Sequence, residues 1–135
     1  MTSMQPRYSV TVRRELIAQH FLVGGDWGRE NMLNSHHYRI EARYEGTSLD
    51  RYGFLLDIDE IYRKLDGLVE RYRDRTLNEL PEFDELNPSV ENFSRILSDR
   101  LVVTAPNVDA LEVTVWEDAD ASAAYRRPLG DNFRG

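Results

Sequence analysis

Alternating apolar and polar residues predict two long strands in the first part of the chain. From Tyr8 onward, apolar residues alternate with Ser, Thr and Arg, which is the period of a half-buried strand, and the apolar run continues to Leu22. A second predicted strand covers Tyr38–Tyr44, where apolar residues alternate with Arg and Glu. The glycine-rich loop 24–28 separates the two strands, and Gly46 ends the second.

Helical spacing then predicts two amphipathic helices. The first begins after Asp57, with Glu60 three residues further on as in a capping box, and its apolar positions continue to Tyr72. The second begins around 87–89, where Asn, Pro and Ser are typical helix-start residues. A short apolar strand at 54–56 is predicted to lead into the first helix.

Two further strands complete an α+β fold. Alternation predicts a third strand at 111–115 and a short fourth strand at 123–126. Because strands and helices do not alternate strictly, the simplest architecture is a four-stranded antiparallel sheet with two helices on one face. Such a sheet has open edges that usually must be paired or blocked, so we expect an oligomer. We expect a single domain over 1–135, with loosely ordered ends at 1–6 and 128–135.

Composition removes several function classes. The 135 residues include no cysteine, which excludes disulfides, thiolate zinc sites and a cysteine nucleophile. The net charge of −7 is unfavourable for binding nucleic acid or an anionic membrane. No apolar stretch reaches the length of a signal peptide or a membrane helix, so we expect a cytoplasmic protein.

The three histidines are candidate metal ligands. His36 and His37 are adjacent in a strand, so their side chains point to opposite faces and only one of them can join His20. His36 is in phase with the apolar residue Tyr38. A catalytic zinc normally has three protein ligands, so two histidines fall short unless Glu30 or another carboxylate completes the set. The favoured interpretation is hydrogen-bonded histidines in a pocket wall or in the sheet.

Glu117 is a carboxylate in phase with an apolar series. It continues the alternation of Leu111, Val113 and Val115, so it falls on the face that is otherwise apolar. A carboxylate there either reaches solvent past the strand end or meets a positive or donor-rich partner. Its two oxygens could accept paired hydrogen bonds from the amino-pyrimidine edge of a pterin or guanine. The phase alone leaves both possibilities open.

The opening turn of the second helix is a further candidate. Its residues Ser89 and Glu91 are fully explained as a helix cap and a partner of the helix dipole. The backbone N–H groups of the same turn could also bind a ligand oxygen.

Six short segments follow one another in a specific order and spacing. They are Ala18-Gln19-His20, Ser35-His36-His37-Tyr38, Gly53-Phe54-Leu55-Leu56-Asp57, Leu77-Asn78, Pro88-Ser89-Val90-Glu91-Asn92 and Val115-Trp116-Glu117. With these segments, the chain resembles the 6-pyruvoyl-tetrahydropterin synthase and 6-carboxytetrahydropterin synthase family from about Tyr8 to Arg126.

The resemblance implies a fold, an assembly and a ligand. The fold is the T-fold, in which an antiparallel sheet with two helices on one face closes with neighbouring subunits into a barrel. Family members form hexamers with active sites at subunit interfaces. The family's pterin-anchoring glutamate corresponds to Glu117, and its pocket-lining turn corresponds to Ser89, Val90 and Glu91.

The catalytic positions depart from the family pattern. The resemblance assigns two of three zinc-binding histidines to His20 and His36, but the middle ligand position holds Asn34, a weak zinc donor. The family's reactive cysteine corresponds to Glu30, and its Asp-His pair corresponds to Arg73 and Asp74. We therefore expect no zinc and no synthase activity.

Three hypotheses follow for this homologue of enzymes of tetrahydropterin or queuosine biosynthesis. The first is a protein that binds a pterin-like ligand and has lost the zinc site and the catalytic triad. The second is an enzyme of altered, metal-independent chemistry on a pterin- or purine-like substrate, with Glu30 and Asp74 as acid and base. The third is a structural or interaction module without a ligand.

Overall fold

A computed structural model describes residues 5–130. Four strands form one antiparallel sheet in the order β1-β2-β3-β4. They are β1 (Tyr8–His20), β2 (Asn34–Gly46), β3 (Ala110–Trp116) and β4 (Ser122–Pro128). The sequence prediction of a four-stranded antiparallel sheet is confirmed.

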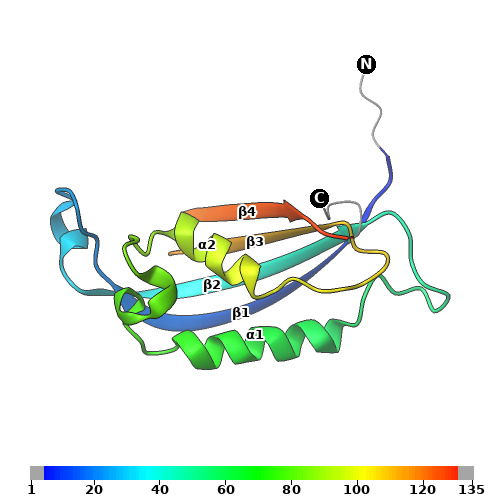
Figure 1. The fold of residues 1–135 in the computed structure, drawn as a ribbon, viewed down its shortest axis with the longest axis horizontal. Helices are drawn as coiled ribbons and strands as arrows, with labels where there is room; N and C mark the ends of the chain where they lie inside the picture. Colours follow the sequence, from blue (N-terminus) through cyan, green and yellow to red (C-terminus); the bar gives the residue numbers. More distant parts are fainter. Residues whose placement is uncertain (1–4, 131–135) are drawn as a thin grey trace, which may run out of the picture.

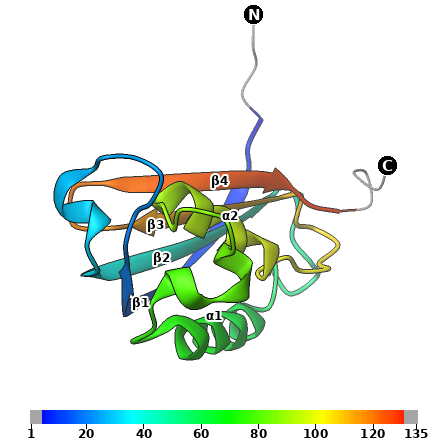
Figure 2. The ribbon, with the colours of Figure 1, turned by 60° about the vertical axis from the view of Figure 1, so that its left-hand side comes forward.

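Two helices cover the same face of the sheet, α1 (Ile58–Tyr72) over β1 and α2 (Val90–Asp99) over β3 and β4, as Figures 1 and 2 show from two directions. Short 3-10 turns join the elements at Gly28–Asn31 (η1), Leu77–Glu79 (η2) and Pro81–Phe83 (η3). No helix among residues 5–130 is both long and apolar enough to cross a membrane.

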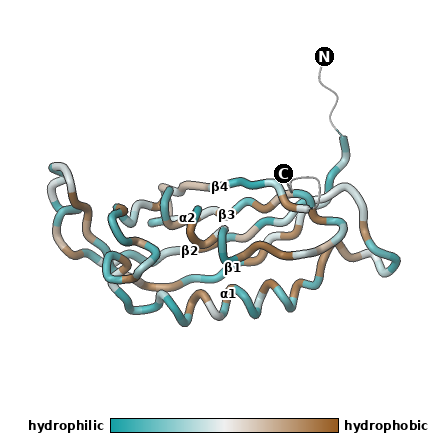
Figure 3. The backbone as a smooth tube through the Cα atoms, viewed as in Figure 1, coloured by the Kyte–Doolittle hydropathy of each residue, from teal (hydrophilic) through white to brown (hydrophobic). Residues whose placement is uncertain are grey.

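The core lies between the helices and the sheet. Hydrophobic and hydrophilic segments alternate along α1 in Figure 3, because only one side of this helix faces the strands. Fully buried aromatic and aliphatic side chains from all layers meet there, among them Tyr38, Tyr44, Ile61, Leu65, Tyr72, Phe93, Leu97 and Leu111. The opposite face of the sheet carries charged residues that pair across strands, including Arg13 with Glu41 at 3.3 Å.

The helix starts follow the expected chemistry. The Asp57 carboxylate accepts a hydrogen bond from the Asp59 N–H at 3.0 Å, and the Ser89 hydroxyl accepts one from the Asn92 N–H at 3.1 Å. Each side chain therefore satisfies one backbone donor that the first turn of its helix leaves free.

One local expectation is wrong. The segment 54–56 is an irregular bend and not a strand, since it pairs with none of the four strands and α1 begins directly afterwards. Beyond β4, Leu129 is buried and its N–H donates to the Asp109 carbonyl at 2.9 Å. The loose ends expected at 1–6 and 128–135 stay a prediction, and 1–4 and 131–135 lie outside the described residues.

Candidate functional site

Strand register brings two of the three histidines together. In the β1–β2 pair, His20 is opposite Asn34 and Ala18 is opposite His36. His20 and His36 are thus diagonal neighbours on one face, and their ring centroids are 4.7 Å apart. His37 points to the other face and pairs with Glu15 at 3.3 Å. The sequence left open which of the two adjacent histidines joins His20, and in the structure it is His36.

Two carboxylates complete the cluster. Glu117 follows the last β3 pair, Trp116 with Arg39, which places it diagonal to His36 on the core face. Its Oε1 lies 3.2 Å from His36 Nε2 and 3.9 Å from His20 Nε2. Glu30, from η1, places Oε2 3.1 Å from His20 Nε2 and 3.8 Å from His36 Nε2.

The contacts of His20 place a hydrogen on its Nδ1. Its Nδ1 lies 3.0 Å from the Pro88 carbonyl oxygen, which can only accept, so Nδ1 carries hydrogen. Nε2 then faces the Glu30 carboxylate. The Tyr38 hydroxyl lies 3.2 Å from the same Nδ1. Burial, with the nearby charges of Glu117 and Glu30, raises the pKa of Tyr38, so this hydroxyl remains protonated at neutral pH.

Amide side chains hold the loop that carries Glu30. Asn78 accepts from the Phe21 N–H at 3.0 Å and donates to the Phe21 carbonyl at 2.8 Å. Asn87 forms the same pair of bonds with Val23, at 2.8 and 3.0 Å. The Leu22 N–H then donates to the Glu30 carbonyl at 2.7 Å, which folds the 3-10 turn back toward the end of β1.

The residues that the sequence assigned to pterin binding meet in one pocket. It has a volume of about 260 Å³ and is lined by His20, Leu22, Glu30, Ser89, Val90, Glu91 and Glu117. This volume is close to the lower limit of small-molecule sites. Glu117 also borders a second cavity of about 420 Å³, whose lining includes His37, Arg39 and Trp116.

The remaining assigned residues lie differently. The Asn34 amide nitrogen donates to the carbonyls of Met32, at 2.8 Å, and His20, at 3.2 Å, so this side chain ties the loop to the end of β1. Asp74 is exposed, with φ at 60°, and its N–H donates to the Ile17 carbonyl at the β1 edge. It is not among the residues that line the pocket around Glu30.

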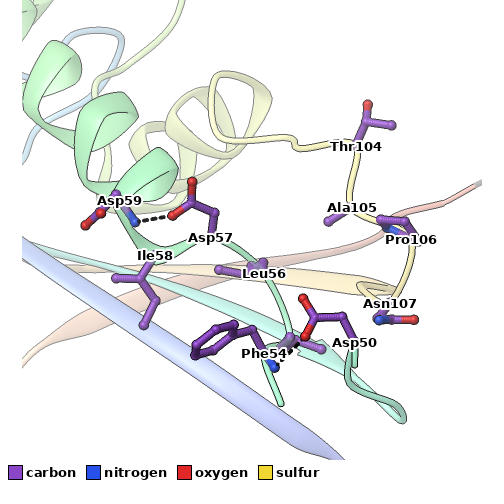
Figure 4. Close-up of a pocket in the computed structure, with 11 residues that line it drawn as sticks. Asp50, Phe54, Leu56, Asp57, Ile58, Asp59, Thr104, Ala105, Pro106 and Asn107 are labelled. Atoms are coloured by element: carbon purple, nitrogen blue, oxygen red, sulfur yellow. Dashed lines mark hydrogen bonds between the residues drawn. The ribbon is translucent and has the colours of Figure 1, made fainter. Parts of the chain in front are cut away.

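A wider cavity of about 660 Å³ lies near the start of α1, beyond the opposite end of β2 (Figure 4). The charged residues that line it are Asp50, Asp57 and Asp59. The carboxylates of Asp50 and Asp57 already accept backbone hydrogen bonds within their own turns, at 2.8 to 3.0 Å. The cavity therefore lacks the converging donors and acceptors of the histidine cluster.

Sequence reasoning missed the residues that support the cluster. Tyr38 and the Pro88 carbonyl orient His20, while Asn87 holds the loop. Only their positions in the sequence could have pointed to a role at the site. Tyr38 is in phase with His36, and Pro88 precedes the helix cap.

No curated protein sequence matches significantly. The solved structure of Caenorhabditis elegans 6-pyruvoyl tetrahydropterin synthase is 17% identical, with a TM-score of 0.77 over 93% of this chain and 99% of that chain. The Plasmodium vivax enzyme is 15% identical, with a TM-score of 0.74 over 93% of this chain and 100% of that chain.

These structural matches establish the fold, which is that of 6-pyruvoyl tetrahydropterin synthases. The family assignment rests on sequence, because a family profile described as 6-pyruvoyl tetrahydropterin synthase matches residues 9–128, most of the chain. This protein therefore belongs to the 6-pyruvoyl tetrahydropterin synthase family.

Proposed function

We propose that the protein binds a pterin-like small molecule between Glu117 and the first turn of α2, and that it does not catalyse the synthase reaction. The observation that carries the proposal is the shared pocket, in which the Glu117 carboxylate faces the helix start at Ser89, Val90 and Glu91. A carboxylate can accept two parallel N–H bonds from an amino-pyrimidine edge, and a helix start provides donors for ring oxygens.

The chemistry of the other positions supports the absence of synthase activity. No cysteine is available as the reactive thiol. Arg73, at a position where the family has an aspartate, is an exposed cation that pairs with Glu70 at 3.0 Å, and it cannot orient a histidine as a carboxylate does.

A second candidate function is acid–base catalysis of a different reaction on a pterin- or purine-like substrate. The contact between Glu30 and His20 favours it, since the two groups lie within proton-transfer distance. Two structures of the P. vivax enzyme, each 15% identical to this chain, carry cysteine or alanine in place of a glutamate described as a catalytic residue. A glutamate can thus be catalytic in this fold. The other carboxylate suggested by the sequence, Asp74, does not line the pocket within one chain.

Isothermal titration calorimetry tests the binding proposal. The protein is titrated with neopterin and with biopterin in buffer containing EDTA. We expect Glu117→Gln to weaken binding at least tenfold, because it removes the charge that strengthens both hydrogen bonds. Glu112→Gln is the matched control, since Glu112 lies in β3, the strand that leads to Glu117, but points to the opposite face, and we expect wild-type affinity. Equal affinity of wild type and Glu117→Gln would contradict the role of Glu117 as the anchor, and no binding by either would contradict the whole proposal and favour a module without a ligand.

The catalytic part of the proposal has a separate test. Incubation with dihydroneopterin triphosphate should give no 6-pyruvoyl-tetrahydropterin above the background without protein. Turnover that is lost in Glu30→Gln would instead establish an enzyme that uses Glu30 in place of the thiol.

A further inference from the structure

We propose that the cavity at the start of α1 is the docking site of the chain's own segment 131–135, with the Phe133 ring on its apolar lining and the Arg134 guanidinium among its aspartates. This segment lies outside the described residues. The cavity lies beyond Gly46 at the end of β2, whereas His36 lies near the start of that strand. The inference therefore does not depend on pterin binding.

The cavity has an apolar lining that the described part of the chain leaves uncovered. Figure 4 shows the segment 54–59 on one side of it and the segment 104–107 on the other. Phe54 and Ile58 contribute to the lining with 60% and 43% of their surface exposed. The volume of about 660 Å³ lies within the range of roughly 300–1,000 Å³ that binding pockets have. An aromatic side chain is therefore a suitable occupant.

The charge of the cavity also calls for a basic partner. Asp50, Asp57 and Asp59 line it, and no basic side chain among residues 5–130 does so. The exposed Asp66, by contrast, pairs with Arg14 at 2.7 Å. Asp50 and Asp57 accept their backbone hydrogen bonds through Oδ1, which leaves the second oxygen of each carboxylate for an arginine.

The described chain ends beside this cavity. A Cβ built on Gly130 would lie 3.7 Å from the Val108 carbonyl oxygen, and Val108 directly follows Asn107, which lines the cavity. An extended chain spans at most about 3.5 Å per residue, so Phe133 can lie up to roughly 10 Å from Gly130. This reach extends to the segment 104–107.

The sequence of 131–135 matches the cavity better than that of 1–4, the other segment outside the described residues. Asp-Asn-Phe-Arg-Gly places an aromatic residue next to a cation, whereas Met-Thr-Ser-Met has no basic side chain. An apolar lining beside three carboxylates fits the first sequence and not the second.

The reactivity of a single cysteine tests the docking, because the chain has no cysteine of its own. Thr104→Cys places a thiol in the exposed lining of the cavity. A thiol reagent should modify it at least tenfold faster when Phe133→Ala or Arg134→Glu is added, because the docked segment otherwise has to open first. Asn132→Ala, in the same segment, should leave the rate unchanged.

Thr11→Cys is the matched control, since Thr11 is exposed on the opposite face of the sheet. Its rate should be the same with and without Phe133→Ala. Equal rates at Thr104→Cys would overturn the inference and agree with the loose end expected from the sequence. An equal rise at Thr11→Cys would also overturn it, because the whole fold would then have loosened.

A cysteine pair shows which molecule supplies the segment. On oxidation, Asn132→Cys with Thr104→Cys should form a disulfide within one chain, and mass spectrometry of the denatured, unreduced protein measures this. A disulfide between two chains would overturn docking within one molecule. Failure of pterin binding would leave all these measurements unaffected, so the two proposals can fail separately.

Discussion

At the residue scale, the candidate site depends on side-chain phase. His36, Tyr38 and Glu117 reach the core face because alternate residues of a strand point to the same side. That assignment was possible from sequence, since it needs only local periodicity. The approach of Glu30 to His20 was not, because it depends on a 3-10 turn that folds back through the Leu22–Glu30 hydrogen bond.

Away from the site, Glu82 is the residue whose charge matters most for acid stability. It accepts two hydrogen bonds from the Arg71 guanidinium, at 2.7 and 2.6 Å, and one from the Tyr72 hydroxyl at 2.6 Å. The Arg71 bonds are the main reason that the pKa of Glu82 falls to about 2 from its ordinary 4.5. The carboxylate thereby joins the end of α1 to η3.

This depressed pKa predicts a defined pH dependence. The stabilisation by Glu82 is complete above pH 4.5 and is lost as the pH falls toward 2, because the unfolded chain takes up the proton first. Glu82→Gln should therefore lower the free energy of unfolding by roughly 1–2 kcal/mol at pH 7, and by less at pH 3. Urea unfolding at both pH values measures this. Glu79→Gln, at an exposed position nearby, is the control. If Glu82→Gln lowered the free energy of unfolding equally at both pH values, the depressed pKa of Glu82 would be refuted.

At the element scale, two glycines differ in how much room their surroundings leave for a side chain. Gly46 ends β2 as the pattern predicted, yet its role is close approach. A Cβ there would overlap the Asn107 carbonyl oxygen of the loop before β3. Gly67, in the exposed middle of α1, has nothing within 4 Å of a built Cβ.

Alanine at these two glycines should have opposite effects. Gly46→Ala should destabilise the protein by about 2 kcal/mol, because the neighbouring backbone has to move. Gly67→Ala should stabilise it by roughly 0.5–1 kcal/mol, since alanine loses less backbone entropy in a helix. Thermal unfolding of both variants checks the prediction, and a neutral Gly46→Ala would show that the loop at Asn107 yields easily.

At the scale of the whole molecule, the sheet has two edge strands. Near His20 the edge of β1 pairs with the turn after α1, where the Gln19 N–H donates to the Arg75 carbonyl and the Asp74 N–H donates to the Ile17 carbonyl. The rest of β1 and all of β4 lie at edges of the four-stranded sheet. Unpaired strand edges favour association, and we propose the hexameric, barrel-closing assembly that the sequence resemblance implies.

The proposed hexamer predicts a particle of six 15.8 kDa chains, about 95 kDa. Native mass spectrometry and light scattering measure this mass. It should stay constant on dilution and in high salt, because backbone hydrogen bonds between strand edges are less sensitive to screening than ion pairs. A monomer at micromolar concentration would contradict the proposed assembly.

The sequence alone determined the four strands, the two helices and the face on which the candidate residues of the strands lie, because periodicity, caps and turn residues act over a few positions. It failed at 54–56, where an apolar run pairs with no strand. Only the tertiary structure decided which residues meet. The register that sets His20 opposite Asn34, the turn that returns Glu30 to His20, and the end of β3 that brings Glu117 to His36 are long-range pairings. These pairings bring two histidines, His20 and His36, and two carboxylates, Glu30 and Glu117, around one point. The sequence by itself offered only three histidines, which were too few for a metal site.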